Sequence, residues 1–307
     1  MSVSAETSSP AALAVAPQAS PRKQERLKRG LRKLVRSKTG LIGAVLLLLI
    51  VGVALFAPWI APHSPGKTNV SVKLLPPMWM SEGTAMYPLG TDNLGRDLLS
   101  RLVYGSRVSL IVGLCSVALS GLIGLVLGLL SGFYGGWIDH LIMRVVDAFL
   151  AIPTILFMLL IMSILGPGLG TLIFVIGITG WVSYARMVRS EVLSIRERDY
   201  VRSSRAVGAR NLRILFVHIL PNVFSSFIVI STLNVAGVII SEASLSFMGL
   251  GIQPPDVSWG GMLSEGRQYL ATSWWVATFP GIAITITVLA IIFLGDWLRD
   301  TLDPKLK

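Results

Sequence analysis

Six long apolar segments restrict what this chain of 307 residues can fold into. They cover residues 41–60, 108–130, 145–165, 169–184, 223–247 and 275–297. A helix needs about 20 predominantly apolar residues to cross a bilayer. The segments are too long for strands and lack the alternation of a membrane barrel. The sequence therefore predicts an all-α, polytopic membrane protein with six transmembrane helices, of which the fourth is short.

The charged residues are few and unevenly distributed. Only 14% of the chain is charged, whereas a soluble domain carries about 25%. Nine of the 27 Lys and Arg residues fall within 22–38 and eight within 186–213, beside apolar segments, so the net charge of +11 does not indicate nucleic-acid binding. Basic residues accumulate on the cytosolic side of a membrane. An N-terminus in the cytosol places 21 of them inside and six outside, which predicts that both termini are cytosolic.

This topology divides the chain into three parts. Residues 1–40 comprise a disordered tail rich in Ala, Ser and Pro and a basic cytosolic segment. Residues 41–107 hold the first transmembrane helix and an extracytoplasmic loop. Residues 108–307 form the core transmembrane domain, which includes a cytosolic loop at 186–221.

Two of the predicted helices carry informative side chains. The second has a small residue at every fourth position, which allows close helix packing or sliding during transport. These residues are Ser116, Ser120, Gly124, Gly128 and Gly132. The fifth is unusually polar, and polar groups avoid lipid, so we expect it to line a water-filled pathway. The residues expected to line it are Ser231, Asn234, Ser241 and Glu242. For Glu242, a gating or substrate contact and a hydrogen-bonded structural role both remain open.

Features of an enzyme are weak in this sequence. The Gly-Lys-Thr triplet at 66–68 resembles the end of a P-loop, but position 61 holds Ala61 in place of the required glycine. The histidines fall on different segments and lack metal-ligand spacing: His63, His140 and His218. Cys115 lies in an apolar segment, where a small core residue is expected. We therefore predict no catalytic set, no metal site and no cofactor in this chain.

The basic cytosolic loop has the signals of two short helices. One helix begins near Tyr200 and is closed by Gly208, since glycine tolerates the left-handed geometry of a helix C-terminus. Asn211 offers an N-cap for the second helix, and Pro221 is expected to end it. Two short helices on this loop predict a rigid protrusion suited to docking into another protein.

At this loop the sequence resembles the inner-membrane permease subunits of bacterial ABC importers, which carry an "EAA" motif here. Gly208, Leu220 and Pro221 match the motif in spacing. The departures are Arg202 at the Glu position, Ser203 and Ser204 at the two Ala positions, and His218 at the Ile position.

Three further stretches resemble the second, "C-type" permease of the dipeptide, oligopeptide and nickel importers. They are GTDNLGRD at 90–97, SEASLSFMGLG at 241–251 and GDWLRDTLDP at 295–304. The resemblance extends from about residue 31 to the end of the chain.

The resemblance implies a type I ABC importer permease fold in the bacterial inner membrane. It implies a homologous partner permease, two cytosolic ATPase subunits that bind ATP and Mg, and an extracytoplasmic solute-binding protein. The chain itself would perform no chemistry. It would couple to the ATPases through the motif residues Tyr200, Val201, Arg202, Ser203, Ser204, Arg205, Ala206, Gly208 and Ala209.

Several alternatives stay open at this point. An ion-coupled secondary carrier is disfavoured because the spans have few ionisable residues at mid-membrane. A membrane enzyme is disfavoured because no catalytic set is present. Peptides are the expected substrate, but nickel, glutathione and oligosaccharides use related permeases. The outer residues Asp92, Arg96, Asp97 and Arg101 could meet the binding protein or pair with one another.

Overall fold

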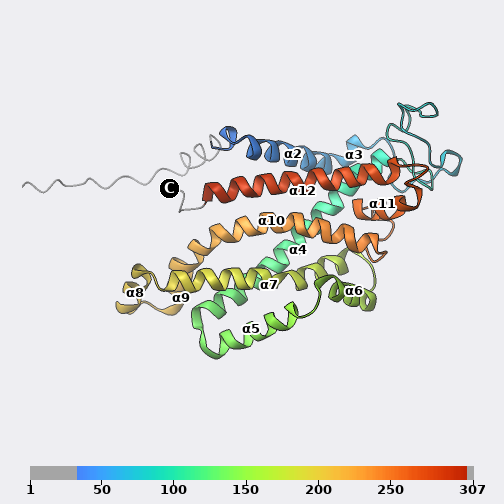
Figure 1. Ribbon diagram of the computed structural model, residues 1–307. Helices are drawn as coiled ribbons and strands as arrows, with labels where there is room; N and C mark the ends of the chain where they lie inside the picture. The colour runs from blue at the N-terminus through green and yellow to red at the C-terminus, as the bar shows by residue number, and fades with distance from the viewer. Residues whose placement is uncertain (1–32, 303–307) are drawn as a thin grey trace, which may run out of the picture.

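The computed structural model describes residues 33–302, and its named elements are all helices (Figure 1). In chain order they are α2 (Lys38–Leu55), α3 (Ala57–Ile60), η1 (Val70–Val72), α4 (Leu98–Tyr134), α5 (Gly136–Leu150), α6 (Thr154–Leu165), α7 (Leu169–Arg196), α8 (Asp199–Ala206), α9 (Asn211–Arg213), η2 (Ile214–Ile219), α10 (Leu220–Phe247), α11 (Trp259–Gly266), η3 (Arg267–Tyr269) and α12 (Trp275–Leu302). The tail predicted to be disordered, at 1–21, and the final residues of the C-terminal motif lie outside this range.

The membrane-spanning architecture is confirmed. Five helices are long and apolar enough to cross a bilayer, and the bent pair α5 and α6 brings the number of candidate spans to six. Helices α2, α12, α10 and α7 run side by side, with α4 crossing them (Figure 1). The loop after α3 lies with α11 at one end of this bundle, and α8 protrudes at the other end (Figure 1).

The fourth span is longer than predicted. Helix α7 has 28 residues, whereas the apolar segment stops at position 184 because Arg186 follows it. The helix continues because its buried face continues, with Ala185, Val188 and Val192 at helical spacing against α4. The hydropathy of the sequence therefore indicates where α7 leaves the lipid, whereas its packing against α4 determines where the helix ends.

The small residues of α4 form its contact with α7, so the predicted packing role is confirmed. A Cβ built on Gly128 would lie 2.7 Å from the carbonyl oxygen of Ala185 and 2.7 Å from the Cβ of Val188. A Cβ on Gly132 would lie 2.7 Å from the Cβ of Val192. Any side chain at these positions would therefore push the two helices apart.

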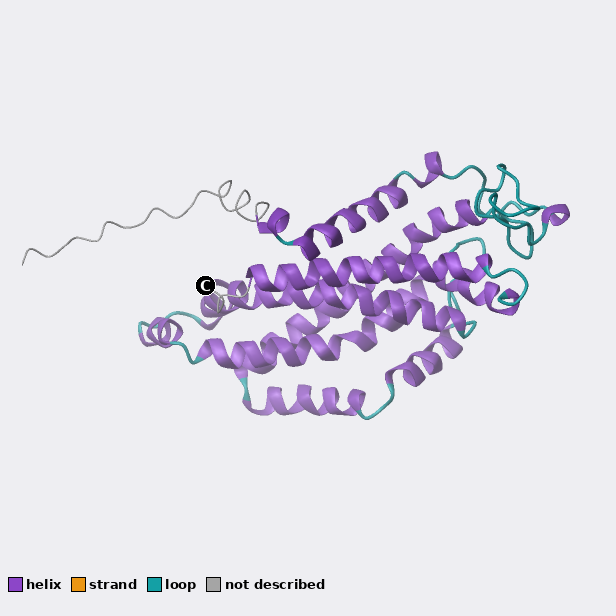
Figure 2. Cartoon of the chain, turned by 45° about the horizontal axis from the view of Figure 1, so that its top comes forward, coloured by secondary structure: helices purple, strands orange, loops and turns teal. Residues whose placement is uncertain are grey.

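The third span is not one continuous helix, so that prediction is wrong. Helices α5 and α6 meet at 87°, and residues 151–153 between them are not helical. The cause is Pro153, because a proline disfavours helical geometry in the residue before it. Figure 2 shows the pair as two helices joined by a loop at the lower edge of the bundle.

Candidate functional site

The loop that is predicted to be cytosolic contains the capped helix that its sequence predicts. Helix α8 ends at Ala206, and Gly208, two residues later, has φ +85°, in the left-handed region. The N–H of Gly208 donates to the carbonyl oxygen of Arg205 at 3.0 Å, and that of Ala209 donates to the carbonyl oxygen of Ser204 at 3.1 Å. These two bonds form a Schellman motif, which satisfies the last carbonyls of the helix and reverses the chain.

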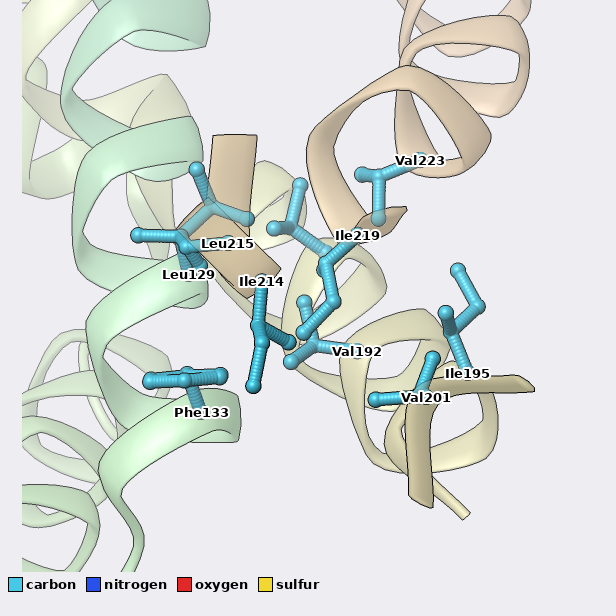
Figure 3. Packing of buried hydrophobic residues seen from close by; sticks show 10 residues of the cluster. Leu129, Phe133, Val192, Ile195, Val201, Ile214, Leu215, Ile219 and Val223 are labelled. Carbon is cyan, nitrogen blue, oxygen red and sulfur yellow. The ribbon is translucent and has the colours of Figure 1, made fainter. Parts of the chain in front are cut away.

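One side of α8 is anchored in a buried hydrophobic cluster. Val201 is fully buried among residues of four other helices (Figure 3). These include Phe133 of α4, Val192 and Ile195 of α7, Ile214 and Ile219 of η2 and Val223 of α10. Helix α8 thus packs against α7 and η2 within a cluster that also includes residues of α4 and α10.

His218 links η2 to α8. Its ring lies 6.0 Å from the ring of Tyr200 in an edge-to-face arrangement, and its Nε2 lies 3.3 Å from the hydroxyl of Ser204. His218 stands at the Ile position of the motif, and its imidazole therefore contacts α8 both through an aromatic ring and through a polar atom.

The opposite side of α8 faces outward. Arg202 donates to the carboxylate of Glu197 at 2.6 Å, although both side chains are more than half exposed. This hydrogen bond and the positive charge of Arg202 hold the pKa of Glu197 below its usual range. Val207 is 89% exposed just before the capping glycine. These exposed side chains, one apolar and two in an ion pair, are available for contact with another protein.

Two details of the loop differ from the sequence prediction. Asn211 does not cap the second helix, since α9 begins with Arg210 at the N-cap position and no side chain makes a capping hydrogen bond. Pro221 does not end that helix either, because it lies in the first turn of α10. A proline normally clashes with the carbonyl four residues earlier. The π-helical turn η2, in which the N–H of Leu220 donates to the carbonyl oxygen of Leu215, is wider and accommodates the ring.

The polar residues of α10 do not all lie on one face. Asn234 and Ser241 are half-buried, and so is Ser231, although its hydroxyl oxygen is covered and has no hydrogen-bond partner among the described residues. Glu242 is fully buried and accepts a hydrogen bond from Ser246 at 2.7 Å. A Cβ on Gly260 of α11 would lie 3.0 Å from the Oε1 atom of Glu242. The burial of Glu242 against α11 favours the structural role.

The charged residues predicted to lie outside the cytosol mainly pair with one another. The Asp92 carboxylate accepts from the Arg96 side chain at 2.6 Å and also pairs with Arg101. Both arginines reach Glu265 of α11, at 2.6 and 3.0 Å. Asp97 instead caps α4 by accepting from the N–H of Ser100 at 3.0 Å. Glu265 was not predicted, because it lies more than 160 residues further along the chain and no local pattern marks it.

The remaining candidates have ordinary surroundings. Cys115 is exposed on α4, so the expectation of a core position is wrong. His63 stacks on Tyr87 with 5.1 Å between ring centroids. Within residues 33–302, no group of three or more His, Cys, Asp or Glu side chains is arranged to hold a metal ion.

Comparison with known proteins places these features in a family. Residues 124–307 match the family described as "Binding-protein-dependent transport system inner membrane component", and residues 26–77 match "N-terminal TM domain of oligopeptide transport permease C". The di/tripeptide transport system permease protein DppC of Pseudomonas aeruginosa is 47% identical over 92% of this chain and 93% of its own length. The dipeptide transport system permease protein DppC of Escherichia coli K12 is 44% identical over 89% of this chain and 91% of its own.

A solved structure supports the fold. The MetNI methionine ABC transporter in an inward facing conformation matches with a TM-score of 0.55 and 22% identity, over 66% of this chain and 96% of that one. The chain therefore belongs to the family of binding-protein-dependent transport system inner membrane components, as a multi-pass, non-catalytic permease subunit of an ABC importer in which separate subunits hydrolyse ATP.

Proposed function

We propose that this chain imports di- or tripeptides as one of two homologous permeases, with two cytosolic ATPase subunits and an extracytoplasmic solute-binding protein. The similarity to DppC proteins along almost the whole chain supports a peptide substrate. Nickel, glutathione and oligosaccharides are the competing substrates to be tested. ATP and Mg would bind to the ATPase subunits only. The importer would lie in the bacterial inner membrane with both termini of this chain in the cytosol.

The observation that carries the proposal is the anchored, capped helix α8. It exposes a short helix at one end of the bundle, while Val201 packs with α7 and η2 in a cluster that extends to α4 and α10. A partner that moved α8 would therefore move the membrane helices with it. We assign ATPase coupling to residues 200–206 together with Gly208 and Ala209.

The pathway would run along α10. Asn234 and Ser241 are accessible polar groups on that helix, and Ser231 lies one turn from Asn234. Polar side chains of this kind replace part of the hydration of a peptide as it crosses the membrane. Because Glu242 is fully buried, we expect it to fix α11 against α10 in the conformation described.

The test is reconstitution of the complete importer. The tagged chain is first purified from its native membranes in mild detergent to recover the partner permease and ATPases. The complex is then placed in proteoliposomes with its binding protein, and uptake of a labelled dipeptide is measured with and without ATP. We expect ATP-dependent uptake that unlabelled dipeptide suppresses and nickel, glutathione and oligosaccharide do not. Uptake that needs an ion gradient and no ATPase subunit would instead establish a secondary carrier.

A further inference from the structure

Helix α5 exposes a face whose two halves differ in polarity. At about 100° per residue, His140, Arg144 and Asp147 fall within an arc of about 60°, and all three are exposed. The adjacent arc carries Leu141 and Val145, which are 57% and 43% exposed. We call these two halves the polar arc and the apolar arc of α5.

The charges of the polar arc have no ionic partner in the described chain. The ion pairs among residues 33–302 include neither Arg144 nor Asp147. By contrast, Asp139 on another side of α5 pairs with Arg189 of α7 at 2.6 Å. The helix thus pairs the charge that faces its neighbours and leaves unpaired the two that face outward.

Lipid is an unfavourable surrounding for the polar arc. Helices α5 and α6 together form a candidate membrane span. An Arg or Asp side chain at the centre of a span costs about 2.5–3.5 kcal/mol. Arg144 could reach the headgroup region with its long side chain. Asp147 has a short side chain and lies about 16 Å along the helix from Gly136, so it depends on water or protein at its own depth.

The C-terminal end of α5 also indicates polar surroundings. The non-helical residues 151–153 are exposed, and Ile152 is 44% exposed. At membrane depth, irregular backbone is tolerated only where protein buries it or where it lines a water-filled cavity. Ala151 is the C-cap just beyond the last residue of α5, and its N–H still donates to the carbonyl oxygen of Asp147, so it continues the polar arc four residues after Asp147. The break and the unpaired charges therefore require the same polar surroundings.

We infer that the polar arc of α5, formed by His140, Arg144, Asp147 and Ala151, lines the aqueous pathway and contacts the charged ends of the transported peptide. A short peptide carries an ammonium and a carboxylate group, and Asp147 and Arg144 provide one counter-charge for each. The apolar arc is shielded from water. The inference rests on the proposed function, since the pathway exists only in the assembled importer.

Thiol labelling of the assembled importer tests this assignment. Cys115 is first replaced by serine, which leaves no other cysteine in the chain. Single cysteines are then introduced as H140C, R144C, D147C and A151C on the polar arc, with L141C and V145C on the apolar arc as matched controls. Inside-out vesicles are treated with a charged, membrane-impermeant thiol reagent.

The two arcs should differ clearly. Because thiols react as hydrated thiolates, we expect the polar arc to be labelled at least about tenfold faster than the controls. Saturating dipeptide should slow this labelling, and labelling should block uptake. Equal rates on both arcs, or no labelling on either, would overturn the assignment. A151C replaces one small residue by another and keeps the test decisive if R144C fails to assemble.

Failure of the inference can be distinguished from failure of the proposed function. ATP-driven dipeptide uptake by the C115S importer is measured before any reagent is added. Absence of uptake there refutes the peptide-importer proposal, whereas the labelling pattern decides the position of the polar arc independently. Normal uptake with uniform labelling refutes the position alone.

Discussion

Substitution of Gly208 by valine isolates the contribution of the α8 cap. The residue has φ +85°, and a Cβ built there meets nothing within 4 Å. Any effect of a side chain is therefore conformational and not a steric clash with a neighbour. Left-handed geometry costs an L-residue about 1–2 kcal/mol, and a β-branched residue falls at the upper end. A cost of about 2 kcal/mol lowers the population of the capped conformation about 30-fold relative to its alternatives.

The assay measures uptake and ATP hydrolysis by the importer in proteoliposomes. We expect Gly208→Val to leave membrane insertion unchanged and to reduce both peptide uptake and peptide-stimulated hydrolysis about tenfold or more, since docking requires the capped loop. Gly208→Asn should retain most activity, because asparagine tolerates the left-handed region. Gly52→Val is the matched control, since Gly52 also has open space but lacks a left-handed φ. Uptake by Gly208→Val at the level of the Gly52→Val control would refute the reasoning, as would an equal loss in Gly208→Asn.

Three further predictions concern the packed and charged regions. Asp92→Asn removes one of the two carboxylates that pair with buried Arg101. Since Glu265 still pairs with Arg101, we expect a loss of about 1.5–3 kcal/mol, the size of a hydrogen bond to a charged group; an unchanged rate of proteolysis of the loop before α4 would contradict this. Gly128→Val forces a side chain between α4 and α7 and should lower the free energy of unfolding by about 1–3 kcal/mol. The purified variant should unfold at a lower temperature than the original protein, and the control Gly52→Val should show no shift. The lowered pKa of Glu197 means that its ion pair with Arg202 is complete above the usual range of a glutamate and is lost only as the pH falls through that lowered pKa. Between about pH 8 and pH 6 this ion pair should therefore stay intact. The measurement is the ATPase activity of the importer, corrected for the pH dependence of the ATPase subunits alone. A fall in this corrected activity that disappears in Glu197→Gln would contradict the prediction.

Features with a strong local cause could be predicted from the sequence. The apolar segments reflect the thickness of the bilayer, so the class of fold and the number of spans follow from them. Gly208 follows a short helix because glycine adopts the left-handed backbone geometry without a steric penalty, and the observed cap agrees with this prediction. The packing face of α4 could be predicted from the helical spacing of its small residues alone.

Features that depend on the surrounding structure could not be predicted. The helix continues through Pro221 because a π turn precedes it, and hydrogen bonding of that kind leaves no sequence pattern. Glu265 reaches Arg96 and Arg101 only after α11 folds back onto the loop before α4. For Glu242, an acid within a span, the sequence leaves a pathway contact and a structural role open, because which neighbour covers a polar residue depends on tertiary packing.

The close contact between α4 and α7 limits which parts of the permease can move. Backbone approaches backbone along this pair, so sliding would drive side chains into the space left by the glycines. We expect the two helices to move as one rigid body. We expect bending at the two irregular points of the chain beside this pair, the break between α5 and α6 and the π turn η2. Since α4 has 37 residues and is about 55 Å long, a small rotation imposed near Tyr134 would become a displacement of several ångströms at its far end near Leu98.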